Sequence, residues 1–530
     1  MMSPPFILIE PRLSCARRSL NLNEFDRLID GLRDPDAYEH PVSRVEVLET
    51  HISGVLLAGD YAYKIKKPVD FGFVNFSTLE KRRHFCEEEL RLNRRFAPEL
   101  YLDVVPVHGS PDSPSLKPAA GAPIEYAVRM KRFDQDALLD RCIHRNGLVT
   151  GGMIESFAAD VAAVHQAAAV AAPDSEYGTP EIVSNNVREC WKPIRDAGLF
   201  EAGRDVESLV EYMDASAVAL GPWFEQRLRR GRVRECHGDL HLGNLFLADE
   251  RIRVFDCIEF NPALRWIDVA NDIAFFTMDL RFHDKAGFAR RFRNAYLDAT
   301  GDRSLLRVLR FYEIYRALVR AKVAGLREIE EAGSGREDAC RHLDLAAYLA
   351  SGNRSTPLVI TYGLSGSGKT FLSSELLAES EAVRIRSDVE RRRFVEKGEG
   401  RYSSDNIEKV YEHLLGVVQE VIGAGYAVIV DATFLRRPRR DSFRRLAGDL
   451  GVPFRILHCS APDSELRRRI ARRARNHADA SEADVDVLDQ QLDNIEPLDP
   501  DEQTVTVRYD SESSPPLSQL LHDLGLDAQP

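Results

Sequence analysis

The chain has 530 residues, too many for one hydrophobic core, and a prior of about 150 residues per domain predicts several units. Its residues are 44% hydrophobic and 29% charged, as in an ordinary globular protein, and a net charge of −13 disfavours nucleic acid as a general partner. The N-terminus lacks signal-peptide features and no window approaches the roughly 18 consecutive apolar residues of a membrane span, so we expect a cytoplasmic protein.

The first half of the chain mixes strands and helices. Residues 45–57 and 61–67 are rich in β-forming residues and flank a glycine-containing turn signal, which predicts a hairpin. Ser77 or Thr78 can cap a helix that runs to about Phe96. Further along the chain, the pattern predicts amphipathic helices over 151–228, short strands with tight turns over 233–260, and a long helix over 305–328.

The second half has a different pattern. Glycine, serine, asparagine and proline accumulate near 351–357, and we place the main domain boundary there. An apolar β-rich run then leads into a glycine-rich loop, after which helical and strand-like segments alternate. This alternation predicts a parallel sheet covered by helices, in a three-layer α/β/α domain. We therefore predict a helical N-terminal extension over 1–44, an α+β domain over 45–350 and an α/β domain over 356–530.

The glycine-rich loop reads GLSGSGKT, a complete match to the P-loop pattern G-x-x-x-x-G-K-[ST] between a buried-type strand and a helical segment. Its backbone N–H groups and the helix N-terminus would hold the phosphates of ATP. Lys369 would reach the β- and γ-phosphates, and the Thr370 hydroxyl would bind Mg²⁺. The predicted nucleotide-binding residues of the loop are Gly363, Ser365, Gly366, Ser367, Gly368, Lys369 and Thr370.

The motifs GLSGSGKT, RSDVERRR and VDATF occur in an order that resembles the small P-loop kinases of metabolite, polynucleotide and zeta-toxin type, over about 355–500. The resemblance implies that Asp388 accepts the proton of an attacking hydroxyl; the alternative is an N-cap of the following helix. Asp431, which ends the strand VIVD, is either a Mg²⁺ ligand or a helix cap. Arg469 and Arg473, spaced i and i+4, are candidates for a lid that neutralises transition-state charge.

A second group of motifs lies upstream, where residues 237–244 read HGDLHLGN and a strand follows with RVFDCIEF. In this spacing Asp239 would lie beside the substrate hydroxyl, while Asn244 and Asp256 would bind the Mg²⁺ that bridges the phosphates. We expect His237 to shape the loop without reacting. The combination resembles the aminoglycoside phosphotransferase and choline kinase branch of the protein-kinase-like fold.

This resemblance also implies a lysine on the third strand, paired with a glutamate on the next helix. AYKIKK places Lys64 and Lys66 on one strand face, and we choose Lys64 because apolar residues flank it. The glutamate is Glu87, Glu88 or Glu89; we favour Glu89 because apolar residues follow it at i+3 and i+7. The alternative is a lysine and a glutamate that both lie on the surface. No G-x-G-x-x-G precedes the lysine.

Together the two modules resemble a bacterial family of bifunctional aminoglycoside phosphotransferase/ATP-binding proteins, over about 40–500. The resemblance implies ATP and Mg²⁺ as cofactors and phosphoryl transfer to a hydroxyl group. We expect the acceptor to be a small hydroxylated metabolite. Two other functions stay open: a nucleotide-gated regulatory protein, and a nucleic-acid 5′-kinase that only the two arginine-rich runs favour.

Overall fold

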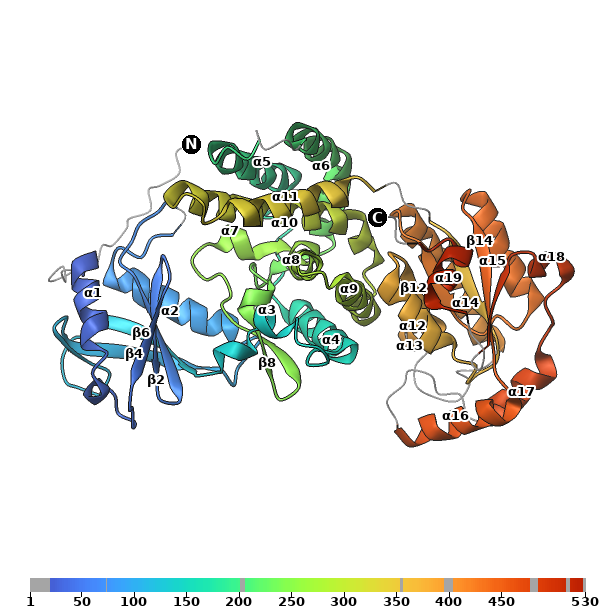
Figure 1. The fold of residues 1–530 in the computed structure, drawn as a ribbon, viewed down its shortest axis with the longest axis horizontal. Coiled ribbons are helices and arrows are strands. Elements are labelled where there is room, and N and C mark those ends of the chain that lie inside the picture. The colour runs from blue at the N-terminus through green and yellow to red at the C-terminus, as the bar shows by residue number, and fades with distance from the viewer. Residues whose placement is uncertain are drawn as a thin grey trace, which may run out of the picture. The chain divides into compact units, whose positions relative to one another are not determined.

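The computed structural model describes residues 20–72, 74–200, 205–352, 356–394, 404–476, 485–510 and 515–527. The chain divides into two compact units. The first contains Met1–Gln135 and Val254–Arg265, and the second contains Asp136–Arg253 and Trp266–Pro530. Figure 1 labels the elements of both units.

The first unit is built on a six-stranded antiparallel sheet with the order β1-β2-β3-β6-β4-β5. The run that we expected over 45–57 divides into two strands, and the second of them forms the predicted hairpin with β3. The strands are β1 (Val45–Glu49), β2 (Ser53–Ala58), β3 (Tyr61–Lys66), β4 (Tyr101–Ser110), β5 (Ser113–Ser115) and β6 (Glu125–Lys131).

The two longest helices of this unit pack on the sheet. Helix α2 (Leu79–Asn93) packs on β4 and β6, and the Thr78 side chain caps it by accepting a hydrogen bond from the Lys81 N–H. Helix α1 (Leu22–Gly31) buries apolar residues, including Phe25 and Leu28, in a core shared with the sheet. The described part of the expected N-terminal extension therefore belongs to the core of the first unit, and residues 1–19 lie outside the described residues.

The second unit begins with a helical part in which short strands carry the motif residues. Strand β7 (Val233–Glu235) pairs with β10 (Trp266–Asp268), and β8 (Leu245–Ala248) with β9 (Arg251–Val254), while η3 (Leu242–Asn244) is a turn of 3₁₀ helix. Helix α8 is buried from Val269 to Leu280. The main helices are α4 (Gly151–Ala167), α5 (Pro180–Asp196), α6 (Val206–Arg229), α8 (Val269–Phe282), α9 (Ala286–Thr300), α10 (Leu306–Glu330) and α11 (Arg336–Ala350).

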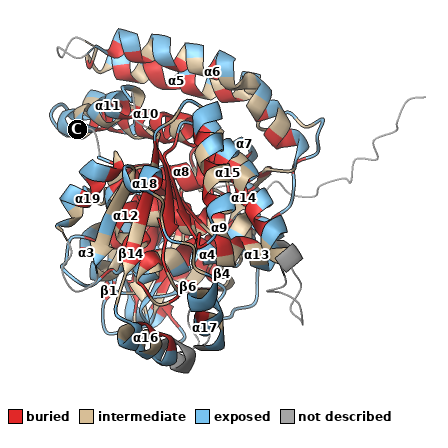
Figure 2. Ribbon diagram, turned by 90° about the vertical axis from the view of Figure 1, so that its right-hand side faces the viewer, coloured by how far each residue is buried: buried red, intermediate tan, exposed pale blue. Residues whose placement is uncertain are grey.

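The rest of the second unit, which we call the P-loop part, contains a five-stranded parallel sheet with the order β12-β13-β11-β14-β15. Strands β11 and β13 are buried along their whole length, and the strands of this sheet are largely red in Figure 2. The strands are β11 (Leu358–Tyr362), β12 (Val383–Arg386), β13 (Val428–Asp431), β14 (Phe454–Ser460) and β15 (Thr506–Asp510).

Helices cover both faces of this sheet. Helices α12 and α19 share an apolar core with one face, and α14 and α15 pack on the other. The predicted three-layer α/β/α architecture is thus confirmed. The helices are α12 (Lys369–Glu379), α13 (Ser387–Phe394), α14 (Ser404–Gly423), α15 (Arg437–Asp449), α16 (Asp463–Asn476), α17 (Val485–Asn494), α18 (Pro500–Gln503) and α19 (Leu517–Leu524).

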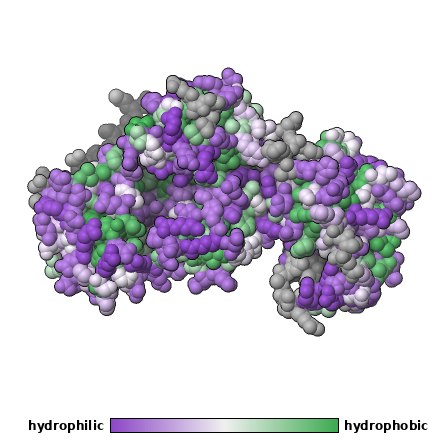
Figure 3. Space-filling model, in the orientation of Figure 1, coloured by the Kyte–Doolittle hydropathy of each residue, from purple (hydrophilic) through white to green (hydrophobic). Residues whose placement is uncertain are grey.

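The surface is mainly polar on the face shown in Figure 3, where hydrophobic residues form small scattered groups. Among the helices that the structure describes, none has the length and apolar character needed to span a membrane.

Candidate phosphotransfer sites

The first unit brings the candidate lysine and glutamate together. Lys64 Nζ lies 2.9 Å from Glu89 Oε1 and also contacts Asp256. Lys66 Nζ lies 2.7 Å from Glu89 Oε2 and also contacts Glu259. The side chains of Lys66 and Glu89 are fully buried, whereas that of Lys64 is 12% exposed and that of Asp256 is 42% exposed. Lys64 and Asp256 therefore form the solvent-accessible end of this ion cluster.

Charge compensates burial in this cluster. Burial alone would lower the pKa of Lys64, but the carboxylates of Asp256, Glu89 and Glu259 raise it well above its usual value. Burial alone would raise the pKa of Glu89, but the two lysines hold it below its usual value. The lysines and Glu89 are therefore ionised at neutral pH, as groups that bind phosphate through charge must be.

Asp256 follows β9 in a backbone conformation that few residues other than glycine adopt, with φ at 64°. Two neighbours hold the segment in place: the Asp256 N–H donates to the Tyr101 hydroxyl at 3.0 Å, and the Cys257 N–H donates to Asn93 Oδ1 at 2.9 Å. Strand β4 and helix α2 thus fix the direction of the Asp256 carboxylate.

In the second unit, the HGDLHLGN motif forms a tight loop between β7 and β8. Asn244 Nδ2 donates to the backbone oxygen of Asp239 at 3.0 Å and to Asp239 Oδ2 at 2.8 Å. His241 Nε2 lies 3.3 Å from the same carboxylate oxygen. Burial alone would raise the pKa of Asp239, but His241, His237 and Arg316 hold it below its usual value. Asp239 is therefore a carboxylate with a fixed orientation at neutral pH.

Two carboxylates of helix α8 accept hydrogen bonds from backbone N–H groups of this loop. Asp272 Oδ2 accepts the His237 N–H at 3.0 Å, and Asp272 Oδ1 accepts the Gly238 N–H at 2.8 Å. Two turns further along the helix, Asp279 Oδ2 accepts the Leu242 N–H at 2.8 Å. The Asp272 carboxylate therefore holds the backbone of the HGDLHLGN loop in place.

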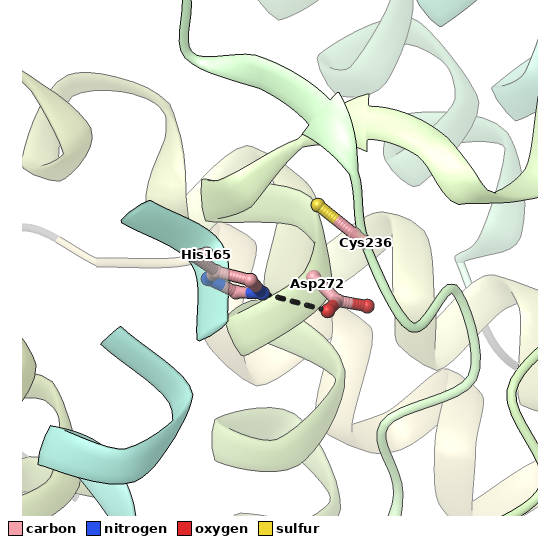
Figure 4. Close-up of side chains that lie close together, drawn as sticks. All are labelled: His165, Cys236 and Asp272. Atoms are coloured by element: carbon pink, nitrogen blue, oxygen red, sulfur yellow. Dashed lines mark hydrogen bonds and ion pairs between the residues drawn. The ribbon is translucent and has the colours of Figure 1, made fainter. Parts of the chain in front are cut away.

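Figure 4 shows Asp272 beside His165 and Cys236, the one group among the described residues whose atoms could together surround a metal ion. Both ring nitrogens of His165 are already used, because Nε2 lies 3.0 Å from Asp272 Oδ2 and Nδ1 lies 2.9 Å from the Tyr296 hydroxyl. The Asp272 oxygens also accept the two loop N–H groups. These contacts identify the cluster as a buried hydrogen-bonded support for the loop.

The P-loop has the backbone that its sequence predicts. Gly363, Gly366 and Gly368 have φ values of 148°, 84° and 94°. A Cβ atom at Gly363 would lie 2.3 Å from the Cys459 carbonyl oxygen, so no larger residue fits there. Lys369 is buried, and its Nζ donates to the carbonyl oxygens of Gly363 at 3.0 Å and Leu364 at 2.7 Å. The lysine thus lies along the loop that its motif places around phosphates.

Two candidate residues, Asp431 and Asp388, lie at the carboxyl ends of neighbouring strands of the parallel sheet. Asp431 ends β13, is buried, and accepts a hydrogen bond from Ser373 Oγ at 3.3 Å. Arg386, which ends β12, is in register with Asp431 on the neighbouring strand β13. Asp388 follows in the first turn of α13. Asp388 Oδ1 accepts a hydrogen bond from Arg391 at 2.8 Å. Carboxylate oxygens and the Thr370 hydroxyl are the hard ligands that Mg²⁺ prefers, so this edge fits that ion.

Helices α16 and α17 contact the P-loop directly. Arg469 Nη1 donates to the Gly366 carbonyl oxygen at 3.2 Å, and Arg469 Nε donates to Glu465 at 2.5 Å. Gln491 Oε1 accepts the Ser365 N–H at 2.8 Å, and Gln491 Nε2 donates to Ser365 Oγ at 3.0 Å. The other lid candidate, Arg473, belongs to α16, but its side chain lies outside the described residues.

Most of the described arginine side chains in the two arginine-rich runs, 436–445 and 467–475, have acidic partners. Arg440 is fully buried against Glu502, with Nε 2.6 Å from Oε1. Arg444 pairs with Asp501 at 2.6 Å. Arg467 pairs with Asp463 and Asp489, and Arg468 with Glu465. These pairs account for the runs as structural and surface ion pairs.

Several residues of the sites did not stand out in the sequence. Lys66 was the weaker of two lysine candidates, and Glu259 had no assigned role, yet both are buried in the ion cluster with Glu89. The alternation of AYKIKK and the spacing DCIE were the only signals for them. Gln491 had none, because it lies 126 residues from Ser365 in the sequence.

Comparison with known proteins identifies two family domains in the chain. The model of the phosphotransferase enzyme family matches residues 79–312, and that of an AAA domain family matches residues 358–498. An uncharacterized protein of Mycobacterium tuberculosis is 31% identical over 456 residues, which cover 83% of this chain and 89% of that protein. A protein of Mycobacterium bovis gives the same values.

The fold and the matches define a kinase, in which a protein-kinase-like phosphotransferase domain is followed by a P-loop kinase domain. The chain belongs to the family of bifunctional aminoglycoside phosphotransferase/ATP-binding proteins, together with these mycobacterial relatives.

Solved structures show similarity to one or the other domain. A choline/ethanolamine kinase family protein from Mesorhizobium loti is 13% identical, with a TM-score of 0.36, over 63% of this chain and 96% of that one. The APS kinase of Mycobacterium tuberculosis is 22% identical, with a TM-score of 0.25, over 32% of this chain and 98% of that one.

Proposed function

We propose that this kinase has two separate centres of ATP-dependent phosphoryl transfer and that each transfers the γ-phosphoryl group to a hydroxyl of a small metabolite. The observation that carries this proposal is that the second unit contains both an oriented, ionised loop aspartate, Asp239, and a buried P-loop lysine, Lys369. A catalytically inactive copy of either domain would have no need to keep these groups in place.

In the first centre, Asp239 would accept the proton of the acceptor hydroxyl. The hydroxyl oxygen would bond to the γ-phosphorus while the bond between the γ-phosphorus and the β–γ bridging oxygen breaks. Lys64 would pair with the phosphates, held ready by Glu89 and Asp256. Asn244 and Asp256 would supply oxygen ligands of the kind that Mg²⁺ prefers. When bound, that ion would neutralise charge on the phosphates.

In the second centre, the P-loop backbone and Lys369 would hold the phosphates, and Asp388 would accept the hydroxyl proton. Thr370 and Asp431 supply oxygen ligands for Mg²⁺, and Arg469 lies on the loop where it can approach the transferring group. The paired state of most lid and α15 arginines favours a small acceptor over a nucleic acid, because those cations are already neutralised.

Two variants test whether the centres are separate. We expect Asp239→Ala and Lys369→Ala each to lower the ATP turnover of its own centre by about 10²–10⁴-fold. The double variant should lower the turnover of both centres. Release of ADP by the full chain should be measured with panels of sugars, nucleosides and oligonucleotides. The exposed residues Asp160 and Lys409 provide matched alanine controls.

Calorimetry separates the main alternative, a nucleotide-gated regulatory protein. The proposal requires two molecules of Mg-ATP bound per chain, and only one in Lys369→Ala, whose P-loop lacks its phosphate-binding lysine. A single binding event, or turnover that neither substitution changes with any acceptor, would contradict it. Steep salt dependence of oligonucleotide binding would instead support a nucleic-acid kinase.

A further inference from the structure

The segment β12–α13 carries Asp388, and its N-terminal end is bound by the helical part of the second unit. Glu381, two residues before β12, accepts hydrogen bonds from Arg281 at 2.8 and 3.0 Å, from Arg290 at 2.9 Å and from Arg293 at 3.0 Å. Arg281 is in α8, and Arg290 and Arg293 are in α9. Three cations therefore converge on one carboxylate at the start of this segment.

The middle and the far end of the segment are held by the same helices. The Arg384 N–H donates to Asn294 Oδ1 at 2.8 Å, which fixes β12 against α9. At the far end, Arg393 Nη2 donates to the carbonyl oxygen of Leu297 at 3.3 Å and also contacts that of Asp298. These contacts join α13 to the C-terminal turn of α9.

The most buried of the contacts joins α13 to Arg303, in the 3₁₀ turn η4 (Arg303–Leu305). Arg303 Nη2 lies 2.6 Å from Glu390 Oε1, and both side chains are only 3% exposed. The other carboxylate oxygen, Oε2, lies 3.1 Å from His413 Nε2 of α14. Glu390 is two residues from Asp388 in the same helix, so its position sets where the Asp388 backbone lies.

An isolated helix of eight residues is not stable in water, so the direction of α13 must come from its tertiary contacts. A buried arginine–glutamate pair adds little net stability compared with apolar packing, but it fixes geometry strictly because both charges must stay paired. A misplacement of about 1 Å at a reacting group can reduce a rate by roughly 10²-fold.

We propose that Arg303 is a positioning residue of the P-loop centre: by holding Glu390, it fixes α13 and thereby the Asp388 carboxylate at the edge of the parallel sheet. The inference rests on the proposed function, in which Asp388 accepts the hydroxyl proton. The P-loop centre then depends on a residue of the other kinase domain.

The test uses the full chain with Asp239→Ala, so that the remaining ATP turnover depends on Lys369. Arg303→Met and Glu390→Gln should each lower kcat by roughly 10²-fold. Binding of Mg-ADP to the P-loop, measured by calorimetry, should stay within about twofold, since Arg303 does not contact the loop. Arg303→Lys should restore part of the rate because it retains the charge. Arg229→Met, at a position 71% exposed, is the matched control.

Hydrogen exchange gives a readout that does not depend on turnover. Arg303→Met should speed exchange of the α13 amides while leaving the P-loop and α12 amides as in the wild type. An unchanged kcat, a loss of ADP binding in proportion to kcat, or equal deprotection of all helices would overturn the proposal. If the wild-type chain shows no Lys369-dependent turnover, the proposed function fails. Hydrogen exchange alone then decides the role of Arg303, and unchanged protection of the α13 amides in Arg303→Met would reject that role.

Discussion

Lys64 and Lys66 lie two positions apart on β3 and share Glu89, but their surroundings give them different roles. Lys66 is fully buried between Glu89 and Glu259, with its Nζ 4.9 Å from the centre of the Phe76 ring. Lys64 is partly exposed and contacts Asp256, whose side chain is 42% exposed. Only Lys64 can exchange its carboxylate contact for a phosphate without leaving a buried carboxylate unpaired.

We therefore expect the two lysine variants to fail in different ways. Lys64→Met should abolish the Asp239-dependent turnover with little change in stability, because Glu89 keeps Lys66 as a partner. Lys66→Met should lower the free energy of unfolding by about 3–5 kcal/mol, because it leaves the buried Glu259 carboxylate without its ion-pair partner. Both are measured in the Lys369→Ala chain, by ADP release and by urea denaturation.

Lys67, which pairs with the exposed Glu49, is the control for both substitutions. A large loss of stability in Lys64→Met together with a stable but inactive Lys66→Met would reverse the assignment of the two lysines.

At the scale of elements, the sequence predicts what depends on neighbouring residues. The strand–loop–helix of the P-loop and the turn residues of HGDLHLGN act over a few positions, and both form as expected. The cap at Thr78 and the hairpin of β2 and β3 are local in the same sense. The local structure that carries the predicted phosphate-binding residues could therefore be predicted from the sequence.

Contacts between elements distant in the sequence could not be predicted in this way. The segment DQQLDN gives no reason to prefer Gln491 over Gln490, because only the direction of α17 decides which amide meets Ser365. Glu381 is likewise one of two acidic residues in 379–381, and the arginines that bind it lie about 90–100 residues away in the chain. Such pairs follow from tertiary packing, which a single sequence does not specify.

Helix α17 contacts both helix α16 and the P-loop. Leu488 packs in a cluster with Leu466 and Ile470 of α16, and Leu364 of the P-loop packs against that cluster. The two hydrogen bonds of Gln491 to Ser365 add a polar contact to this apolar one. The conformation of the P-loop is therefore coupled to the position of both helices.

Gln491→Ala should weaken Mg-ATP binding at the P-loop by roughly 5- to 150-fold, since it removes two hydrogen bonds that contribute roughly 0.5–1.5 kcal/mol each. Calorimetry on the Asp239→Ala chain measures this, and Gln490→Ala is the control, because Gln490 is exposed and adjacent. Tighter binding in Gln491→Ala would show that the carboxamide competes with a phosphate oxygen instead of supporting the loop.

At the scale of the whole molecule, helix α8 takes part in both kinase domains. Asp272 and Asp279 hold the loop of Asp239, and Arg281, two residues after Asp279, binds Glu381 of the P-loop part. The helix is buried throughout this stretch. Because its side chains are fixed at both ends, we expect the helical and P-loop parts of the second unit to unfold together.

Glu381→Gln tests this coupling. Burial alone would raise the pKa of Glu381, but Arg281, Arg293 and Arg290 hold it well below 4.5. Its charge therefore contributes stability that is fully present above about pH 4.5 and is lost as the pH falls through the lower folded-state pKa. At pH 7 the variant should lose about 3–5 kcal/mol, because three buried arginines lose their shared partner.

Calorimetric unfolding of Glu381→Gln should show a lower Tm at pH 7 and a difference from the wild type that shrinks as the pH falls below about 4.5. The transition of the second unit should also separate into two, since the strongest ionic contact between its parts is gone. Glu379→Gln, at the exposed last residue of α12, should behave like the wild type. A Tm difference that stays constant down to pH 3, or a transition that remains single, would mean that apolar packing of α9 on α12 couples the parts without the help of this carboxylate.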